Sequence, residues 1–236
     1  PQISNNDKEK LEVIYRNANR MNYLINELLT FSKIEMKQMR ISVRKGDIMH
    51  FLEELSHIFD IVAGEREIDF IVNLEDTEEE VWFSPSKLER ILYNLLSNAF
   101  KYTQPGGYVK LSAKLIKEEK GTFVQISVKD NGRGIPKEAQ EQIFESYYQV
   151  EKRDHREGFG LGLSLTRSLI HMHKGEIRVE SEINKGSDFI VTLNVSEDAY
   201  NPDERSSENI TTEEIQKYNQ RIKETIELIP EKLTNK

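Results

Sequence analysis

Four short motifs constrain this chain more than any other feature of its sequence. In chain order they read NLLSNAFKYT (94–103), DNGRGIP (130–136), GFGLGLS (158–164) and NKGSDF (184–189). Each sets polar residues or glycines beside an apolar run. The apolar runs have to enter a core, whereas their polar neighbours need hydrogen-bond partners. The order of the motifs therefore predicts one core and one site built from several loops.

Composition and charge exclude several classes of protein. Of the 236 residues 31% are charged and 37% are hydrophobic, as in globular proteins with exposed helices. The net charge of −8 disfavours nonspecific binding to nucleic acid. Because cysteine is absent, disulfides and thiolate metal sites are excluded. No apolar run approaches the roughly 18 residues of a membrane span, so we expect no membrane contact by this part of the protein.

Residues 8–35 are predicted to form one long helix with a narrow apolar seam. The seam residues recur at alternating spacings of three and four: Leu11, Ile14, Ala18, Met21, Ile25 and Leu28. Because a single helix cannot bury such a seam, we expect it to associate with partner helices. Packing of this helix on its own domain is the alternative.

The rest of the chain predicts an α+β fold, in which helices cover one face of an antiparallel or mixed sheet. A polar connector is expected at 36–46, and an acidic linker with a marginal helix after 196. The predicted helices are 47–63, 84–102, 136–144 and 161–173. The predicted strands are 68–74, 81–83, 108–116, 122–129, 176–182 and 188–195.

The first motif has the residue types of a metal and phosphate site. Asn94 and Asn98 are four residues apart and share one helix face. A hydrated divalent cation that holds phosphates would satisfy both amides. Lys101 and Tyr102 could supply a phosphate cation and a surface for an adenine ring. The alternative is a pair of structural amides, a surface lysine and a half-buried tyrosine.

The second and third motifs add a carboxylate and glycines. Asp130 can accept a hydrogen bond from an exocyclic amine, while Gly132 and Gly134 let a base lie against the backbone. A glycine-rich turn at 158–162 leads into a helix N-terminus, which favours anions. A plain turn and tight helix packing are the alternatives for these two motifs.

Together the motifs resemble the catalytic ATP-binding domain of sensor histidine kinases, in the superfamily shared with DNA gyrase and heat-shock chaperones. The resemblance covers 47–195. The preceding RMNYLINELLTFSKIE, at 20–35, resembles the second helix of the kinase dimerisation hairpin. The resemblance implies a two-layer sandwich of helices on a mixed, mostly antiparallel sheet, with ATP and Mg²⁺ as cofactors.

The resemblance also implies roles for individual residues. Asn98 would be the magnesium ligand with Asn94 beside it, and Lys101 would contact phosphate; these three are the expected catalytic residues. Tyr102 would lie by the base and Asp130 would hold the adenine amine. The other expected nucleotide contacts are Gly132, Gly134, Ile135, Phe144 of the F-box, Gly158, Gly160, Leu161, Gly162, Leu163 and Ser187. The polar segment 149–157 would be a lid that is mobile without nucleotide.

The sequence departs from the family pattern in four respects. The phosphoacceptor motif, a histidine followed by an acidic residue and Arg-Thr-Pro, is absent. The five histidines are His50, His57, His155, His171 and His173. His57 mimics the start of the motif but lies after the connector, so we do not expect it to accept phosphate, and His173 matches a packing position. The other three departures are Phe159 and Asp188, each where threonine is usual, and Ser84, where aspartate is usual.

We therefore predict an ATP-binding catalytic fragment of a histidine kinase that transfers phosphate to a histidine outside this chain. Its parts would be half of a dimerisation hairpin (1–35), the connector, the catalytic domain (47–195) and the tail, which weakly suggests a hybrid kinase. Expected partners are a second copy of the chain and a response regulator or receiver domain. The expected location is cytoplasmic, with an inner-membrane anchor of the full-length protein left open. An ATP-hydrolysing gated clamp and a degenerate nucleotide-binding scaffold remain as alternatives.

Overall fold

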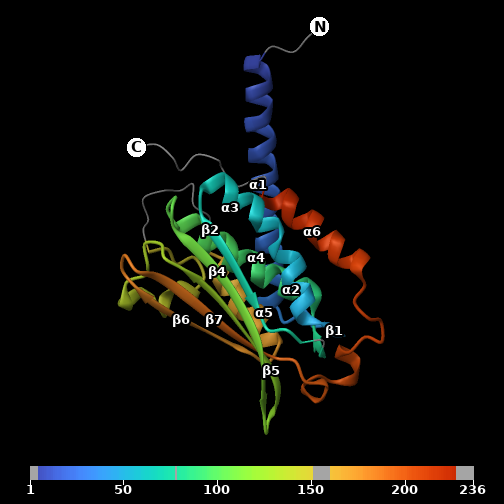
Figure 1. Cartoon of the computed structure of the whole chain (residues 1–236). Coiled ribbons are helices and arrows are strands. Elements are labelled where there is room, and N and C mark those ends of the chain that lie inside the picture. Colours follow the sequence, from blue (N-terminus) through green and yellow to red (C-terminus); the bar gives the residue numbers. More distant parts are fainter. Residues whose placement is uncertain (1–4, 78, 151–159, 227–236) are drawn as a thin grey trace.

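The computed structural model describes residues 5–77, 79–150 and 160–226 of the chain. One sheet carries a layer of helices on one face, and the helix α1 (Asn5–Glu35) projects beyond this body (Figure 1). Among the described helices, none combines the length and the apolar character needed to cross a membrane.

The main sheet has five strands in the order β2-β4-β5-β7-β6. Only the β2–β4 pair is parallel, and the other three pairs are antiparallel. The predicted α+β class, with a mixed and mostly antiparallel sheet, is therefore confirmed. The strands are β2 (Asp69–Leu74), β4 (Tyr108–Glu118), β5 (Gly121–Asp130), β6 (Glu176–Glu182) and β7 (Gly186–Asn194).

The helical layer comprises α2 (Ile48–Ser56), α3 (Ile58–Arg66), α4 (Pro85–Tyr102) and α5 (Gly162–Met172). The single helix predicted over 47–63 is thus two helices. The side chain of Asp47 caps α2 by accepting from the His50 amide at 2.9 Å. At the break, the Ser56 hydroxyl donates to the Glu53 carbonyl, the kind of local bond that competes with helix continuation.

The N-terminus of α4 is tied to the end of α5 by a buried histidine. The Ser84 amide donates to Nε2 of His173, and Nδ1 of His173 lies 2.9 Å from the Leu169 carbonyl. Burial lowers the pKa of His173 to about 4, so the ring is neutral at pH 7. The burial and hydrogen bonds of His173 confirm its expected packing role. The Ser84 side chain makes no hydrogen bond that caps α4.

Three predicted elements differ from the expectation in their pairing or their form. The strands at 68–74 and 81–83 enter separate sheets, because β3 (Glu80–Phe83) pairs antiparallel with β1 (Arg44–Asp47) of the connector. The helix expected over 136–144 is two 3₁₀ turns, η1 (Lys137–Ala139) and η2 (Gln142–Phe144). Short turns of this kind are common as connectors.

The segment after β7 returns to the connector. Val43 forms a parallel bridge with Arg205, and backbone bonds join Val43 to Glu204 and Ser206. A small second core of Ile41, Val43 and Tyr200 lies beneath this pairing. Two further 3₁₀ turns, η3 (Glu197–Ala199) and η4 (Pro202–Glu204), lie in the returning segment.

The tail then forms α6 (Thr212–Ile226), which lies along the helical layer (Figure 1). Its buried face is Ile215, Tyr218 and Ile222, and Tyr218 packs edge-on against Phe51 of α2 with ring centroids 5.8 Å apart. The tail therefore differs from the marginal helix expected, because these few apolar residues all meet the domain core.

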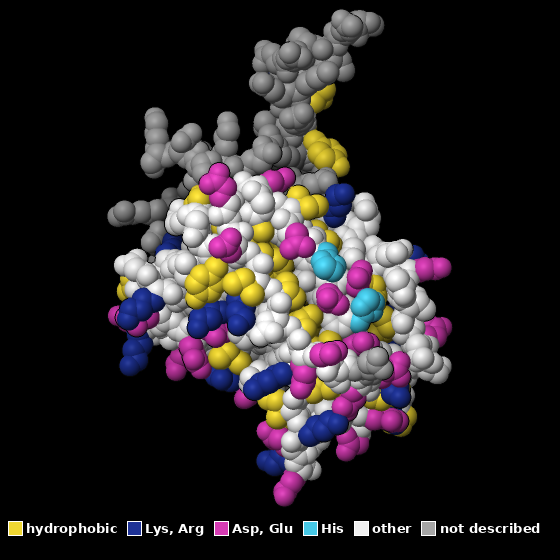
Figure 2. Space-filling view, in the orientation of Figure 1, with side chains coloured by type: hydrophobic (Ala, Val, Ile, Leu, Met, Phe, Trp, Pro, Cys, Tyr) yellow, Lys and Arg dark blue, Asp and Glu magenta, His cyan; other side chains and the backbone are white. Residues whose placement is uncertain are grey.

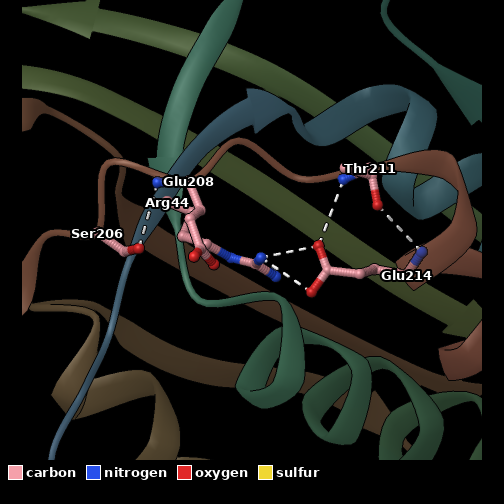
Figure 3. Close-up of polar contacts among 5 residues, drawn as sticks. All are labelled: Arg44, Ser206, Glu208, Thr211 and Glu214. Carbon is pink, nitrogen blue, oxygen red and sulfur yellow. Dashed lines mark hydrogen bonds and ion pairs between the residues drawn. The ribbon is translucent and has the colours of Figure 1, made fainter.

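One ion pair fixes the start of α6 on the connector. Nη1 of Arg44 donates to both carboxylate oxygens of Glu214, at 2.9 and 2.7 Å (Figure 3). Thr211 caps the helix, since its hydroxyl accepts from the Glu214 amide while Glu214 accepts from the Thr211 amide. The pairing holds the pKa of Glu214 below its usual range.

The C-terminal part of α1 rests on the domain, and its seam remains accessible. Arg90 of α4 donates to the Thr30 hydroxyl at 2.9 Å and lies 4.0 Å from Glu27, which is 6% exposed. Phe31 contacts the Tyr147 ring. The predicted seam residues whose exposure is described are open to solvent: Leu11, Ile14, Ala18, Met21, Ile25 and Leu28. The helix thus packs on its own domain and still presents a surface for a partner helix.

Charges of both signs are interspersed on the surface seen in Figure 2. Lysine and arginine side chains lie among aspartates and glutamates, and on this face they do not gather into one basic tract. The face in this view therefore offers no extended attraction to a polyanion.

Candidate nucleotide-binding site

A cavity of about 300 Å³ lies between α4, the end of β5 and the start of α5. The predicted site residues converge on it from separate segments of the chain. Those that line the cavity are Asn94, Asn98, Lys101, Tyr102, Asp130, Gly134, Ile135, Gly160, Leu161, Gly162, Leu163 and Ser187. The single site expected from the order of the motifs is thus a single cavity.

Asp130 is the buried acid of this cavity. It ends β5, is 5% exposed, and accepts a hydrogen bond at Oδ1 from the Gly132 amide at 2.8 Å. Burial raises the pKa of Asp130 to about 6, and the nearby charge of Asp188 acts in the same direction. Hydrogen bonds from the backbone amides of Gly132 and Ser187 oppose the rise. The carboxylate is therefore mainly charged at pH 7 and can accept from an amine.

Gly132 allows two backbone segments to approach each other. A β-carbon at this position would overlap the Tyr102 carbonyl, and the Arg133 amide donates to that carbonyl at 3.3 Å. The end of α4 is thereby placed against the turn that follows Asp130. Gly132 is therefore not among the residues that line the cavity, and its expected contact with nucleotide stays a prediction.

Asn94 and Asn98 lie on the α4 face that borders the cavity, as the four-residue spacing predicts. Nδ2 of Asn94 donates to Oγ1 of Thr166 on α5, at 2.8 Å. Within the described ranges no group of three or more histidine, cysteine, aspartate and glutamate side chains could hold a metal ion. A cation here would thus depend on amide oxygens, phosphates and water, a donor set that suits Mg²⁺.

The start of α5 borders the cavity with a helix N-terminus, which favours anions. Gly160 has a φ of +69°, a conformation that side chains rarely adopt, and it turns the chain into the helix that begins at Gly162. Gly162 and Leu163 line the cavity, and they belong to the first helical turn, whose amides have no partner within the helix. Of the predicted lid, Gln149 and Val150 are described and line the cavity, whereas 151–157 and Gly158 lie outside the described residues.

Two cationic side chains lie close to the aromatic ring of Tyr102. Arg133 lies over the ring with its guanidinium carbon 4.3 Å from the centroid, and Nζ of Lys101 lies 4.8 Å from it. Lys101 also donates to the tyrosine hydroxyl at 3.1 Å. Positive charge therefore gathers at this side of the cavity, where phosphates or a base would be attracted.

Phe144 belongs to the core instead of the cavity wall. It is 9% exposed and packs edge-on against Phe189, which does line the cavity.

Ser187 lies in a hydroxyl network. Its Oγ is 3.0 Å from the Oγ of Ser181, and the Ser181 hydroxyl accepts a hydrogen bond from the Ile135 amide. These contacts tie the last glycine motif to the turn after Asp130.

Several lining residues were not predicted from the sequence. They include Leu24 and Glu27 of α1, Tyr93, Ser97, Arg133, Tyr148 and Phe189. Arg133 could have been found, because it lies inside the second motif. Leu24 and Glu27 could not, since only the packing of α1 brings them to the cavity.

Comparisons with known proteins identify a family and relatives of similar sequence. Residues 83–197 match the family described as histidine kinase-, DNA gyrase B-, and HSP90-like ATPase. The sensor histidine kinase WalK of Bacillus subtilis is 34% identical over 190 residues, which is 80% of this chain and 31% of WalK. The chain thus spans about a third of the length of that relative.

Solved structures share the fold. The catalytic domain of the histidine kinase ThkA, in a nucleotide-free form, is 25% identical with a TM-score of 0.58; the match covers 68% of this chain and all of that domain. Full-length ShkA in complex with AMPPNP has a TM-score of 0.72 at 24% identity, over 83% of this chain and 40% of ShkA.

Proposed function

The chain belongs, through residues 83–197, to the ATPase family of histidine kinases, DNA gyrase B and HSP90, and on this premise we propose that it is the catalytic part of a sensor histidine kinase. The reaction is transfer of the γ-phosphoryl group of Mg-ATP to a histidine outside this chain. The convergence of four separate motifs on one cavity, with a buried carboxylate beside Gly134 and the start of α5, carries the proposal.

Each part of the cavity suits one part of ATP. Asp130 accepts a hydrogen bond from the adenine amine, and its own bond from Gly132 fixes the carboxylate. The first amides of α5 and the cations around Tyr102 bind phosphate oxygens. The protein's contribution is therefore orientation and charge stabilisation.

Asn98 would hold Mg²⁺, with Asn94 beside it on the same face of α4. The ion, when bound, neutralises charge on the phosphates. In the transfer, an imidazole nitrogen forms a bond to the γ-phosphorus as the bond from that phosphorus to the bridging oxygen breaks. ADP leaves with the electron pair of the broken bond.

The residue at position 94 separates this proposal from an ATP-hydrolysing clamp. Such relatives place a glutamate one helical turn before the metal asparagine, whereas this chain has Asn94. An amide cannot serve as a general base near pH 7, so water is not activated there. The site should hold ATP with little hydrolysis.

The exposed seam of α1 supports a second proposal, that the full-length protein dimerises through hairpin helices. A response regulator or receiver domain would then accept the phosphate.

The decisive experiment uses the purified chain, Mg-ATP and a supplied helical hairpin that carries an acceptor histidine. We expect saturable Mg-ATP binding by calorimetry, slow hydrolysis, phosphate on the hairpin and none on the chain itself. Rapid hydrolysis would favour the clamp, and absence of binding would favour the degenerate scaffold. Acid-labile, base-stable phosphate on this chain alone would show that one of its five histidines is the acceptor.

A further inference from the structure

Thr166 lies behind the cavity on α5, and none of the recognised motif positions includes it. The residue is 1% exposed, and its Oγ1 accepts the hydrogen bond from Nδ2 of Asn94 at 2.8 Å. Asn94 belongs to α4, so this bond joins the two helices that border the cavity.

Gly162 confines the other end of the same amide. A β-carbon at Gly162 would lie 2.5 Å from Oδ1 of Asn94, so a larger residue would displace the amide. Gly162 and Thr166 are four residues apart, about one helical turn, and therefore share one face of α5. On this face, Thr166 accepts the hydrogen bond from the side-chain nitrogen of Asn94, and Gly162 lies against the side-chain oxygen of Asn94.

We propose that Thr166 is a positioning residue that determines which atom of Asn94 faces a magnesium ion and the phosphates. A carboxamide is asymmetric, because its nitrogen only donates and its oxygen only accepts. While Thr166 accepts from Nδ2, Oδ1 stays beside Gly162, which lines the cavity, and Mg²⁺ and its waters require oxygen. The inference rests on the proposed Mg-ATP function and specifies how the site is kept ready for the ion.

Replacement of Thr166 by valine removes the acceptor and keeps the branched shape of the side chain. Nδ2 of Asn94 would lose its buried partner, and rotation of the amide would turn its protons toward the ion. Groups that orient a metal ligand typically change metal affinity by about 10- to 100-fold. A general structural role for Thr166 would instead weaken binding with and without the ion.

The test measures the Kd of a non-hydrolysable ATP analogue on the full chain by calorimetry, once with Mg²⁺ and once with EDTA. The ratio of the two constants is the magnesium-dependent gain in affinity. We expect Thr166→Val to lower this gain about tenfold, with the Kd in EDTA unchanged, and Thr166→Ser to restore it. Equal weakening in both conditions, or an unchanged gain, would overturn the role of Thr166.

Ser168→Ala is the matched control on the same helix. It removes a side-chain hydrogen bond, from Ser168 to the Ser164 carbonyl at 3.0 Å, that does not reach Asn94. We expect its gain to equal that of the unmodified chain. Thermal unfolding of each variant separates loss of fold from loss of orientation.

A second variant tests orientation itself. Asn94→Asp presents oxygen whichever way the group rotates, so in that background Thr166→Val should no longer reduce the gain. The same tenfold loss in both backgrounds would reject an orienting role. An unmodified chain that binds the analogue equally well with and without Mg²⁺ would overturn the metal part of the proposed function, and the inference with it; absence of any binding would overturn the function as a whole.

Discussion

Asp130 is the residue on which nucleotide recognition is expected to depend most. Its neutral isostere keeps the shape and can still meet an amine, but it lacks the charge that strengthens the hydrogen bond. We expect Asp130→Asn to weaken Mg-ATP binding by about 1–3 kcal/mol, as measured by calorimetry. Unchanged affinity would contradict the assignment of the adenine contact to Asp130.

The same carboxylate predicts a dependence of binding on pH. Since burial raises its pKa to about 6, protonation should weaken ATP binding as pH falls from 7 to 5. Calorimetry across this range should show the loss, and Asp130→Asn should flatten this component of the curve.

Folding stability should respond to this group in the opposite direction. A raised pKa means that the folded state binds the proton more tightly than the unfolded state. Protonation of Asp130 should therefore raise the free energy of unfolding as pH falls from about 6 toward the ordinary carboxyl pKa of 3.8. A loss of affinity in this range, with the fold intact by circular dichroism, would separate titration of the site from unfolding.

The residue types of the site could be predicted because each motif carries its own chemistry. Two amides at helical spacing and a carboxylate after a strand can be recognised from the sequence alone, and in the structure all three residues line one cavity. The roles assigned to them stay predictions. Thr166 was not predicted, because a threonine inside an apolar helix has no local signal; only the packing of α4 on α5 gives it a partner.

Helices and strands could be predicted where the spacing of apolar residues within the segment itself indicates the element. The β4–β5 hairpin and helix α4 match their patterns, whereas β1 arises from a polar connector whose partner strand lies 33 or more residues later. Helix α6 has sparse apolar residues, so its sequence alone indicated a marginal helix. The structure shows that three of them, at one face, complete the core against α2.

Helix α6 should therefore contribute measurably to stability. Ile215 is 4% exposed in the core, so Ile215→Ala should lower the free energy of unfolding by about 2–4 kcal/mol in denaturant titrations. Gln216→Ala, at the adjacent exposed position of the same helix, is the matched control and should change stability by less than about 0.5 kcal/mol. Equal small effects would show that α6 is detached in solution.

At the scale of the whole molecule, the tail and the connector form one unit with the catalytic domain. A chain that ends at residue 195 would lose the partner of Val43, the cover of Ile41 and the face of α6. We expect this truncated chain to melt at a lower temperature and to bind a hydrophobic dye more strongly than the full chain, by calorimetry and fluorescence. An unchanged melting temperature would mean that the tail adds nothing to the fold.

The pairing of Arg44 with Glu214 also has a consequence for the order in which the molecule is completed. The two residues are 170 positions apart, so during synthesis the connector leaves the ribosome long before its partner exists. Until then, the strand residues around Val43 lack their final neighbour, and loop closure over that length is entropically slow. The docking of α6 on the connector should thus be among the last events of folding, after the tail has been made.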